Sequence, residues 1–237
     1  MRSQDSRRGC ASGAGPGARG SAARAAGRGR AALPDLAAAL AALARGGVVV
    51  YPTETLYGLG ARALLAAAVA KVAALKGRDA TKPIAVIVSE AAMVDQIAQC
   101  VPEPAARLMA RFWPGPLTLV LPARAGLPAH LSAGSGLVGV RVSSHPVAHA
   151  LAAALGEPIT ATSANRGGEP PAREIATAEH ALGAGVDVYV DGGVLAGGSG
   201  STVVVVGDEA VRVIRAGAVS LAALRDALGT TPLESPD

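Results

Sequence analysis

The stretch Val48-Val-Val-Tyr-Pro-Thr-Glu-Thr-Leu-Tyr-Gly58 carries the pattern on which the fold prediction depends. Its first four residues are bulky and apolar, which predicts a strand buried on both faces, and Pro52 ends the strand because proline cannot donate to a strand ladder. Before this stretch, leucines at helical spacing over 33–43 predict a helix. After the strand we expect a polar loop over 53–60. A helix, a buried strand and a polar loop in this order are typical of α/β folds.

The same alternation of helices and strands continues toward the C-terminus. Ser89 is expected to cap one of the helices, and Pro146 stands where another helix should begin. The last two strands flank Gly207-Asp208 and predict a hairpin, so the sheet should be mixed and the fold a single α/β domain. We expect helices over 64–76, 90–99, 103–112, 146–155, 173–182 and 219–228, and strands over 84–88, 117–121, 137–142, 158–162, 186–190, 201–206 and 210–214.

Composition excludes several classes of protein. Half of the 237 residues are hydrophobic, enough for a sizeable core and too many for global disorder. No run of eighteen apolar residues is free of charge and proline, so we predict no transmembrane helix and no membrane partner. Cys10 and Cys100 cannot build a disulfide framework, which indicates a reducing compartment.

The net charge of +4 is unevenly distributed along the chain. Residues 1–32 hold seven arginines and one acid, so the remainder carries 15 basic and 17 acidic groups. That balance, with five aromatic residues in all, disfavours a strong nucleic-acid binder. We expect residues 1–32 to be a disordered Arg/Gly/Ala-rich leader, either a transit peptide or an extension without a role. The domain should cover 33–230, and 231–237 should be a tail.

Polar groups at strand ends are the first candidates for a functional site. Thr53-Glu-Thr55 follows a strand at its carboxyl end, where α/β proteins bind ligands, although the same hydroxyls could stabilise an ordinary turn. Thr160-Ala-Thr-Ser-Ala-Asn165 offers hydroxyl and amide groups that could bind a carboxylate or phosphate, or satisfy their own backbone. Gly200-Ser-Thr202 and Arg215 are weaker candidates of the same kind.

Cations form a second group of candidates. Lys76, Arg78 and Lys82 fall within seven residues of a lysine-poor chain. They could neutralise a polyphosphate or form a solvated charged turn. Arg141 interrupts the apolar strand 137–142, so it should either pair with a carboxylate in the core or open into a pocket for an anionic ligand.

Other motifs indicate structure rather than chemistry. Trp113-Pro-Gly-Pro116 predicts a rigid turn more than a ligand contact. His145 and His149 are four residues apart but lack the glutamate of a metalloprotease helix, so we expect them on the surface. The chain has neither GxxxxGK[ST] nor GxSxG, which leaves a Walker-type ATPase and a serine hydrolase unsupported.

Taken together and in order, these segments resemble the threonylcarbamoyl-AMP synthase family in its short form, which has the YrdC-like fold. The resemblance covers roughly 34–229. Its matching strings are Pro52-Thr-Glu-Thr-Leu-Tyr-Gly-Leu59, Leu75-Lys-Gly-Arg78 with Lys82-Pro83, Trp113-Pro-Gly-Pro-Leu-Thr-Leu-Val120, Val138-Gly-Val-Arg141 with His145-Pro146, Thr162-Ser-Ala-Asn165, Asp191-Gly-Gly193, Ser201-Thr-Val-Val204, and Arg215 with Gly217.

The resemblance implies condensation of L-threonine, bicarbonate and ATP, with Mg²⁺, to threonylcarbamoyl-AMP and pyrophosphate. A transferase complex would then pass the threonylcarbamoyl group to an adenosine of tRNA. It also implies a twisted mixed sheet, flanked by helices, around a deep positive cavity. The implied catalytic residues are Lys76, Arg78 and Arg141; the implied threonine contacts are Thr53, Arg141, Ala161 and Ser201; and the implied nucleotide contacts are Lys76, Arg78, Lys82, Ser163, Asn165 and Arg215. No residue is assigned to a metal.

Three departures from the family pattern remove side chains that some relatives carry. Ile87 replaces a histidine, Gly167 replaces a serine and Val205 replaces an aspartate. The alternatives to the synthase are an RNA-binding module, a carbamoyl-transfer module of the same fold, and an inactive subunit of a tRNA-modification assembly. Weak RNA binding is compatible with the synthase itself. The expected compartment is the cytoplasm, or a mitochondrion or other organelle if the leader is a targeting sequence.

Overall fold

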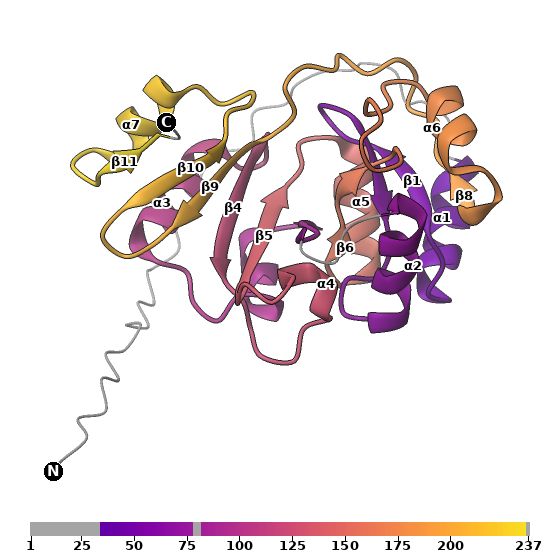
Figure 1. The fold of residues 1–237 in the computed structure, drawn as a ribbon, viewed down its shortest axis with the longest axis horizontal. Helices are drawn as coiled ribbons and strands as arrows, with labels where there is room; N and C mark the ends of the chain where they lie inside the picture. The colour runs from indigo at the N-terminus through magenta and orange to yellow at the C-terminus, as the bar shows by residue number, and fades with distance from the viewer. Residues whose placement is uncertain (1–33, 78–81, 236–237) are drawn as a thin grey trace, which may run out of the picture.

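A computed structural model describes residues 34–77 and 82–235 (Figure 1). The helices are α1 (Pro34–Ala44), α2 (Ala66–Lys76), α3 (Glu103–Phe112), α4 (Ala129–Ser132), α5 (Pro146–Leu155), α6 (Ile175–Leu182) and α7 (Leu221–Leu228), with 3₁₀ turns at Ala91–Gln96 and Gly183–Gly185. The strands are β1 (Val49–Pro52), β2 (Tyr57–Gly60), β3 (Val86–Val88), β4 (Leu117–Pro122), β5 (Leu137–Val142), β6 (Ile159–Thr160), β7 (Thr162–Ser163), β8 (Val188–Tyr189), β9 (Thr202–Val206), β10 (Val211–Arg215) and β11 (Leu233–Glu234).

The strands form two mixed sheets, where the sequence predicted one. The small sheet has the order β7-β2-β1-β8 and the large sheet the order β11-β10-β9-β4-β5-β3-β6. The mixed α/β class, with helices flanking the strands, is confirmed (Figure 1). The apolar segment predicted as strand 158–162 divides at Ala161, because β6 pairs with β3 of the large sheet and β7 with β2 of the small one. The predicted hairpin is also confirmed, since β9 and β10 pair antiparallel.

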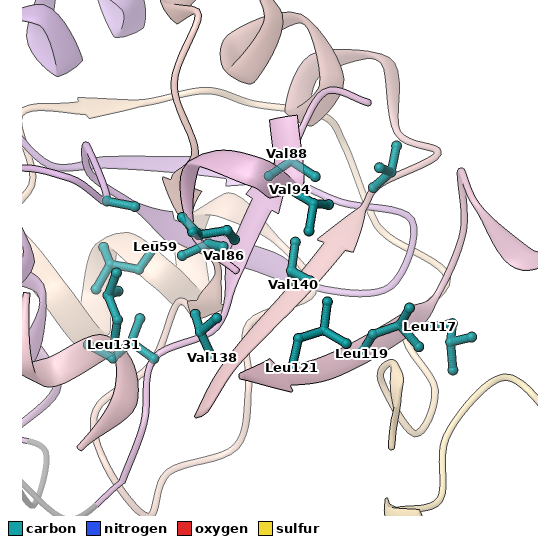
Figure 2. Packing of buried hydrophobic residues seen from close by; sticks show 14 of the residues in the cluster. Leu59, Val86, Val88, Val94, Leu117, Leu119, Leu121, Leu131, Val138 and Val140 are labelled. Atoms are coloured by element: carbon teal, nitrogen blue, oxygen red, sulfur yellow. The ribbon is translucent and has the colours of Figure 1, made fainter. Parts of the chain in front are cut away.

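One face of the large sheet packs into the main hydrophobic core (Figure 2). Leu119 and Leu121 of β4 lie there beside Val138 and Val140 of β5, all fully buried. Leu131 of α4 joins the same cluster. Successive side chains of a strand point to opposite faces, so the intervening residues of β4 and β5 face away from this core.

A second core lies between α1, α5 and the strands β1 and β3. Leu43 and Leu151 pack there against Val49 and Tyr51. Ile87 is fully buried in the same cluster. Pro146 begins α5, as its position in the sequence predicts.

Strand β2 occupies part of the segment expected to be a loop. The ring of Tyr51 on β1 lies over Gly58 and Gly60 of β2, so a Cβ on Gly60 would come within 2.6 Å of the Tyr51 Cε1 atom. The Tyr51 hydroxyl donates to the Thr160 carbonyl oxygen at 2.8 Å. Gly58 and Gly60 are therefore glycines because the Tyr51 ring packs closely on this strand, and not because the segment is a flexible loop.

Other boundaries differ from the sequence prediction as well. The helix expected over 90–99 is a single 3₁₀ segment, and its cap is Glu90 without a side-chain hydrogen bond, so Ser89 does not cap it. Leu233 pairs with Val211 of β10, so the expected tail contributes β11 to the large sheet. The predictions for the leader, residues 1–32, lie outside the described residues. Within the described part of the chain, no helix has the length and apolarity to cross a bilayer.

Candidate functional site

A cavity of about 680 Å³ lies between the two sheets. The small sheet lines it with Tyr57, Gly58, Thr162 and Ser163. The large sheet lines it with residues of β3, β4, β5, β9 and β10. From the connecting segments come Thr53, Thr55, Leu56, Pro83, Ala85, Ser135, Ala161, Asn165, Glu169, Pro171, Gly198, Ser199, Gly200 and Ser201.

The two-residue period of the strands decides which side chains of the large sheet reach the cavity. On β5, Val138, Val140 and Val142 belong to the core, whereas Leu137, Gly139 and Arg141 line the cavity. The same alternation applies on the neighbouring strands: the cavity side carries Thr118 and Val120 of β4, Val203 and Val205 of β9, and Arg212 and Ile214 of β10. This face therefore brings side chains from four strands together, and the polar ones come from β4, β5 and β10.

The sequence left two possibilities for Arg141, a carboxylate partner or a place in a ligand pocket, and the structure shows both. Its Nη1 atom donates to Glu54 Oε1 at 2.5 Å, so it has a carboxylate partner, and it also lines the cavity. The other carboxylate oxygen of Glu54 accepts from the Ser143 hydroxyl. The side chains of Arg141 and Glu54 are only 8% and 14% exposed.

Thr53 serves the backbone of its own loop. Its hydroxyl donates to the Leu56 carbonyl oxygen at 2.7 Å and accepts from the Leu56 amide at 3.2 Å. The Thr55 amide also donates to it at 3.3 Å. Thr53 and Thr55 both line the cavity, so the turn-stabilising role and a place in the site coexist.

A second polar cluster joins β4, β9 and β10. The hydroxyls of Thr118 and Ser201 are 2.9 Å apart. The Arg215 Nη2 atom donates to the Ser201 carbonyl oxygen at 2.8 Å and to its hydroxyl at 3.1 Å. Burial, and secondly the positive charge of Arg141, lowers the pKa of Arg215. Arg141, Arg212 and Arg215 all line the cavity, so three guanidinium groups share it.

Lys76 lies behind the cavity wall rather than on it. Its ammonium group donates to the Ser163 carbonyl oxygen at 2.7 Å and to Asn165 Oδ1 at 2.9 Å, and its residue exposure is 4%. Ser163 and Asn165 line the cavity themselves. Lys82 is exposed next to the lining residue Pro83, and Arg78 lies outside the described residues.

The three departures from the family pattern fall in different places. Val205 lines the cavity and pairs across the strands with Arg212. Gly167 donates its amide to the Lys76 carbonyl oxygen at 2.7 Å and does not line the cavity. Ile87 is buried in the second core, away from it. Ala161, the expected backbone contact, does line it.

Residues 191–200 connect the two walls of the cavity. In Figure 1 this orange segment runs over the top of the molecule from β8 to β9. The Tyr57 hydroxyl donates to the Gly193 carbonyl oxygen at 2.8 Å and accepts from the Gly192 amide at 2.9 Å. Burial raises the pKa of Tyr57 to about 12. The motif Asp191-Gly-Gly193 therefore attaches the segment 191–200 to Tyr57 of β2.

Two other motifs have structural roles. The Trp113 Nε1 atom donates to the Leu117 carbonyl oxygen at 2.7 Å, which fits the rigid turn that its prolines predict. His145 caps α5, because its Nδ1 atom accepts from the Val147 amide, and it is partly buried rather than on the surface as expected. Burial lowers the pKa of this imidazole. His149 is exposed, as predicted.

Sequence reasoning assigned no role to four polar residues of this site: Glu54, Thr118, Ser143 and Arg212. A signal for two of them was present. Thr118 and Arg212 alternate with apolar residues on strands whose other face is core, which is the pattern of a polar cavity wall. Glu54 stands in the candidate segment Thr53-Glu-Thr55, but it meets Ser143 only through the pairing of the fold, so no local pattern identifies this contact.

The fold and cavity define a class: an α/β protein that binds anionic ligands between two sheets, through guanidinium, hydroxyl and amide groups. Within that class the chain belongs to the Sua5/YciO/YrdC family, whose model, described as "Telomere recombination", matches residues 41–217.

Named relatives extend over most of the chain. The threonylcarbamoyl-AMP synthase of Xanthomonas campestris is 42% identical over 162 residues, which is 67% of this chain and 86% of the relative. That of Bacillus subtilis is 37% identical over 197 residues, 83% of this chain and 57% of the relative. The crystal structure of P. abyssi Sua5 complexed with L-threonine has a TM-score of 0.79 at 32% identity, covering 84% of this chain and 58% of that one. The chain thus spans less than two thirds of the last two proteins.

Proposed function

We propose that this protein is an L-threonylcarbamoyladenylate synthase, a nucleotidyltransferase that condenses L-threonine, bicarbonate and ATP and releases pyrophosphate. The observation that carries the proposal is that the polar groups from distant segments line one cavity rather than separate surfaces. Seven of the expected contacts lie on its walls: Thr53, Arg141, Ala161, Ser163, Asn165, Ser201 and Arg215. The names of the relatives, and the threonine complex of P. abyssi Sua5, support the same reaction.

Arg141 would hold the threonine carboxylate, because a guanidinium group matches a carboxylate with paired hydrogen bonds. The hydroxyls of Thr53 and Ser201 would contact the rest of the amino acid, together with the backbone at Ala161. Their fixed hydrogen bonds limit the rotamers that they can adopt. Preorganisation of this kind lowers the entropic cost of substrate binding.

The nucleotide would lie along Ser163, Asn165 and Arg215. Lys76 would hold the first two in place, and Arg78 and Lys82, in and beside the segment 78–81, would neutralise the phosphates. Within the described residues, no group of three or more carboxylate, imidazole or thiol side chains could hold a metal ion. Magnesium would arrive as part of the substrate, bound to the phosphates of ATP, because this ion usually keeps its waters and needs few protein ligands beside substrate phosphates.

The proposed reaction needs no covalent enzyme intermediate. The threonine amine takes up carbon dioxide from bicarbonate to give a carbamate, and a carbamate oxygen attacks the α-phosphorus while the bond to pyrophosphate breaks. Water is the remaining product of the bicarbonate. The protein's own contribution is to hold both substrates in line, stabilise negative charge and keep solvent from an unstable mixed anhydride.

The test is pyrophosphate release by purified protein with Mg·ATP. We expect release only when both threonine and bicarbonate are present. A correctly folded protein that releases none under these conditions would refute the synthase. Steep, salt-dependent tRNA binding by such a protein would then favour the RNA-binding module.

Two further parts of the proposal concern the cell rather than the cavity. The product would pass to a transferase complex that modifies an adenosine of tRNA. We expect the reaction in the cytoplasm, where both ATP and the tRNA to be modified are present. Transfer of the threonylcarbamoyl group to tRNA in a coupled assay with such a complex would test the first part.

A further inference from the structure

Glu54 turns away from the cavity that its two neighbours line. Thr53 and Thr55 are part of the cavity wall, whereas Glu54 reaches from the end of β1, in the small sheet, to Arg141 of β5, in the large sheet. The Ser143 hydroxyl holds the second carboxylate oxygen. Both oxygens of Glu54 are therefore engaged, and the carboxylate is fixed in position.

This arrangement leaves one side of the Arg141 guanidinium group available to a ligand. Its bond to Glu54 uses Nη1. Among the described residues, nothing hydrogen-bonds its Nε or Nη2 atoms, and the side chain lines the cavity. A guanidinium group held at one nitrogen can still offer two donors to a carboxylate.

The same contact compensates the charge of Arg141. Arg215 lies in the same cavity, and its lowered pKa reflects first burial and then the charge of Arg141. With Glu54 present, the Arg141 end of the cavity carries a balanced ion pair. Without it, the charge of Arg141, whose side chain is only 8% exposed, would be uncompensated in a cavity that Arg212 and Arg215 also line, where a small polyanion would bind well.

We infer that Glu54 is a positioning residue that orients Arg141 and offsets its charge, so that this end of the cavity prefers a zwitterionic amino acid to a phosphate ion. A zwitterion has no net charge and needs one cation for its carboxylate. A phosphate dianion gains more from an uncompensated cation, so removing the charge of Glu54 should change the preference. The inference rests on the proposed function for the identity of the amino acid.

The test compares Glu54→Gln with Glu157→Gln by calorimetry. Glutamine keeps the size of Glu54 but removes its charge and weakens its hold on Arg141. Glu157 is the matched control, because it forms a two-point ion pair with Arg62, and neither residue lines the cavity. The dissociation constants of L-threonine and of inorganic phosphate are measured for each protein.

For Glu54→Gln we expect the threonine dissociation constant to rise roughly tenfold, the size of one charge-assisted hydrogen bond. The phosphate dissociation constant should fall several-fold, to about a fifth of the wild-type value. Glu157→Gln should change neither. If both constants of Glu54→Gln match those of the wild type, the inference is wrong. A loss of threonine affinity without tighter phosphate binding would also overturn it, because a loop that is merely damaged loses both ligands.

A second variant covers the case in which Glu54→Gln does not fold. Ser143→Ala removes one of the two contacts of the carboxylate and leaves its charge, so threonine binding should weaken about threefold with phosphate binding unchanged. Unchanged threonine binding in this variant would contradict the orienting role. A wild-type protein that binds no threonine would refute the proposed function, while the phosphate measurements would still decide the role of Glu54.

Discussion

The buried ammonium group of Lys76 gives the sharpest prediction outside the Glu54 pair. Lys76→Met replaces it with an uncharged side chain of similar length. The change removes hydrogen bonds to the Ser163 carbonyl oxygen at 2.7 Å and to Asn165 Oδ1 at 2.9 Å, in a residue that is 4% exposed. Both acceptors would then lose a charged donor at a site that water hardly reaches.

The magnitude follows from these contacts. A hydrogen bond to a charged group contributes about 1.5–3 kcal/mol to the free energy of unfolding. For a protein of this size each kcal/mol moves the melting temperature by about 2–4 °C. The loss of two such bonds is offset in part because the variant no longer buries a charge, so we take the net loss as that of about one bond and expect Tm to fall by roughly 3–12 °C. The KM for ATP should rise about tenfold or more, because Ser163 and Asn165 are no longer held at the cavity wall.

The assay combines thermal unfolding with pyrophosphate release at varied ATP. Lys71→Met is the matched control: Lys71 is on the same helix, is exposed, and donates to the Gly46 carbonyl oxygen at 2.9 Å. We expect it to change stability by about 0.5 kcal/mol or less and to leave the KM for ATP unaltered. The reasoning is refuted if Lys76→Met keeps the wild-type Tm. A normal KM for ATP despite a lowered Tm would show that Lys76 supports the fold but not the nucleotide site.

Two further predictions concern hydroxyl groups near the cavity. Thr118→Val removes the partner of the Ser201 hydroxyl, 2.9 Å away, at nearly constant volume. The loss of a hydrogen bond of about 0.5–1.5 kcal/mol should raise the KM for threonine roughly twofold to tenfold. An unchanged KM would exclude the Thr118–Ser201 pair from the threonine site. Burial raises the pKa of Tyr57 from 10.0 to about 12, so the unfolded chain loses this proton first as the pH rises. The free energy of unfolding should therefore fall between about pH 10 and 12, and urea unfolding of Tyr57→Phe should show a smaller fall over that range; an equal fall would assign it to other groups.

The fold was predictable where the signal for a helix or strand lies within the segment itself. Leu137–Val142 and Glu103–Phe112 have the bounds that the sequence predicted, because continuous apolar runs and helical spacing are local signals. Tyr57–Gly60 was mistaken for loop because its two glycines suit a turn equally well. The reason for those glycines is the ring of Tyr51, which reaches them only once β1 and β2 pair.

The site was predictable as a set of residue types but not as a geometry. Arg141 was recognised because a guanidinium group in an apolar strand needs an explanation. Its partner Glu54 is 87 positions away, and the sequence contains no sign that these two meet. Lys76 was expected to face the phosphates, yet the loop 163–165 covers it, and such coverage depends on packing rather than on local pattern.

The division of the chain at Ala161 has a mechanical consequence. Thr160 pairs with β3 and Thr162 pairs with β2, so at this point one residue, Ala161, separates the two sheets along the chain, and neighbouring Cα atoms are only about 3.8 Å apart. The two sheets are therefore held close together at residue 161, along one side of the cavity. Because Ala161 also lines the cavity, the two sheets cannot separate far at this position, and any motion that widened the cavity would have to occur away from residue 161.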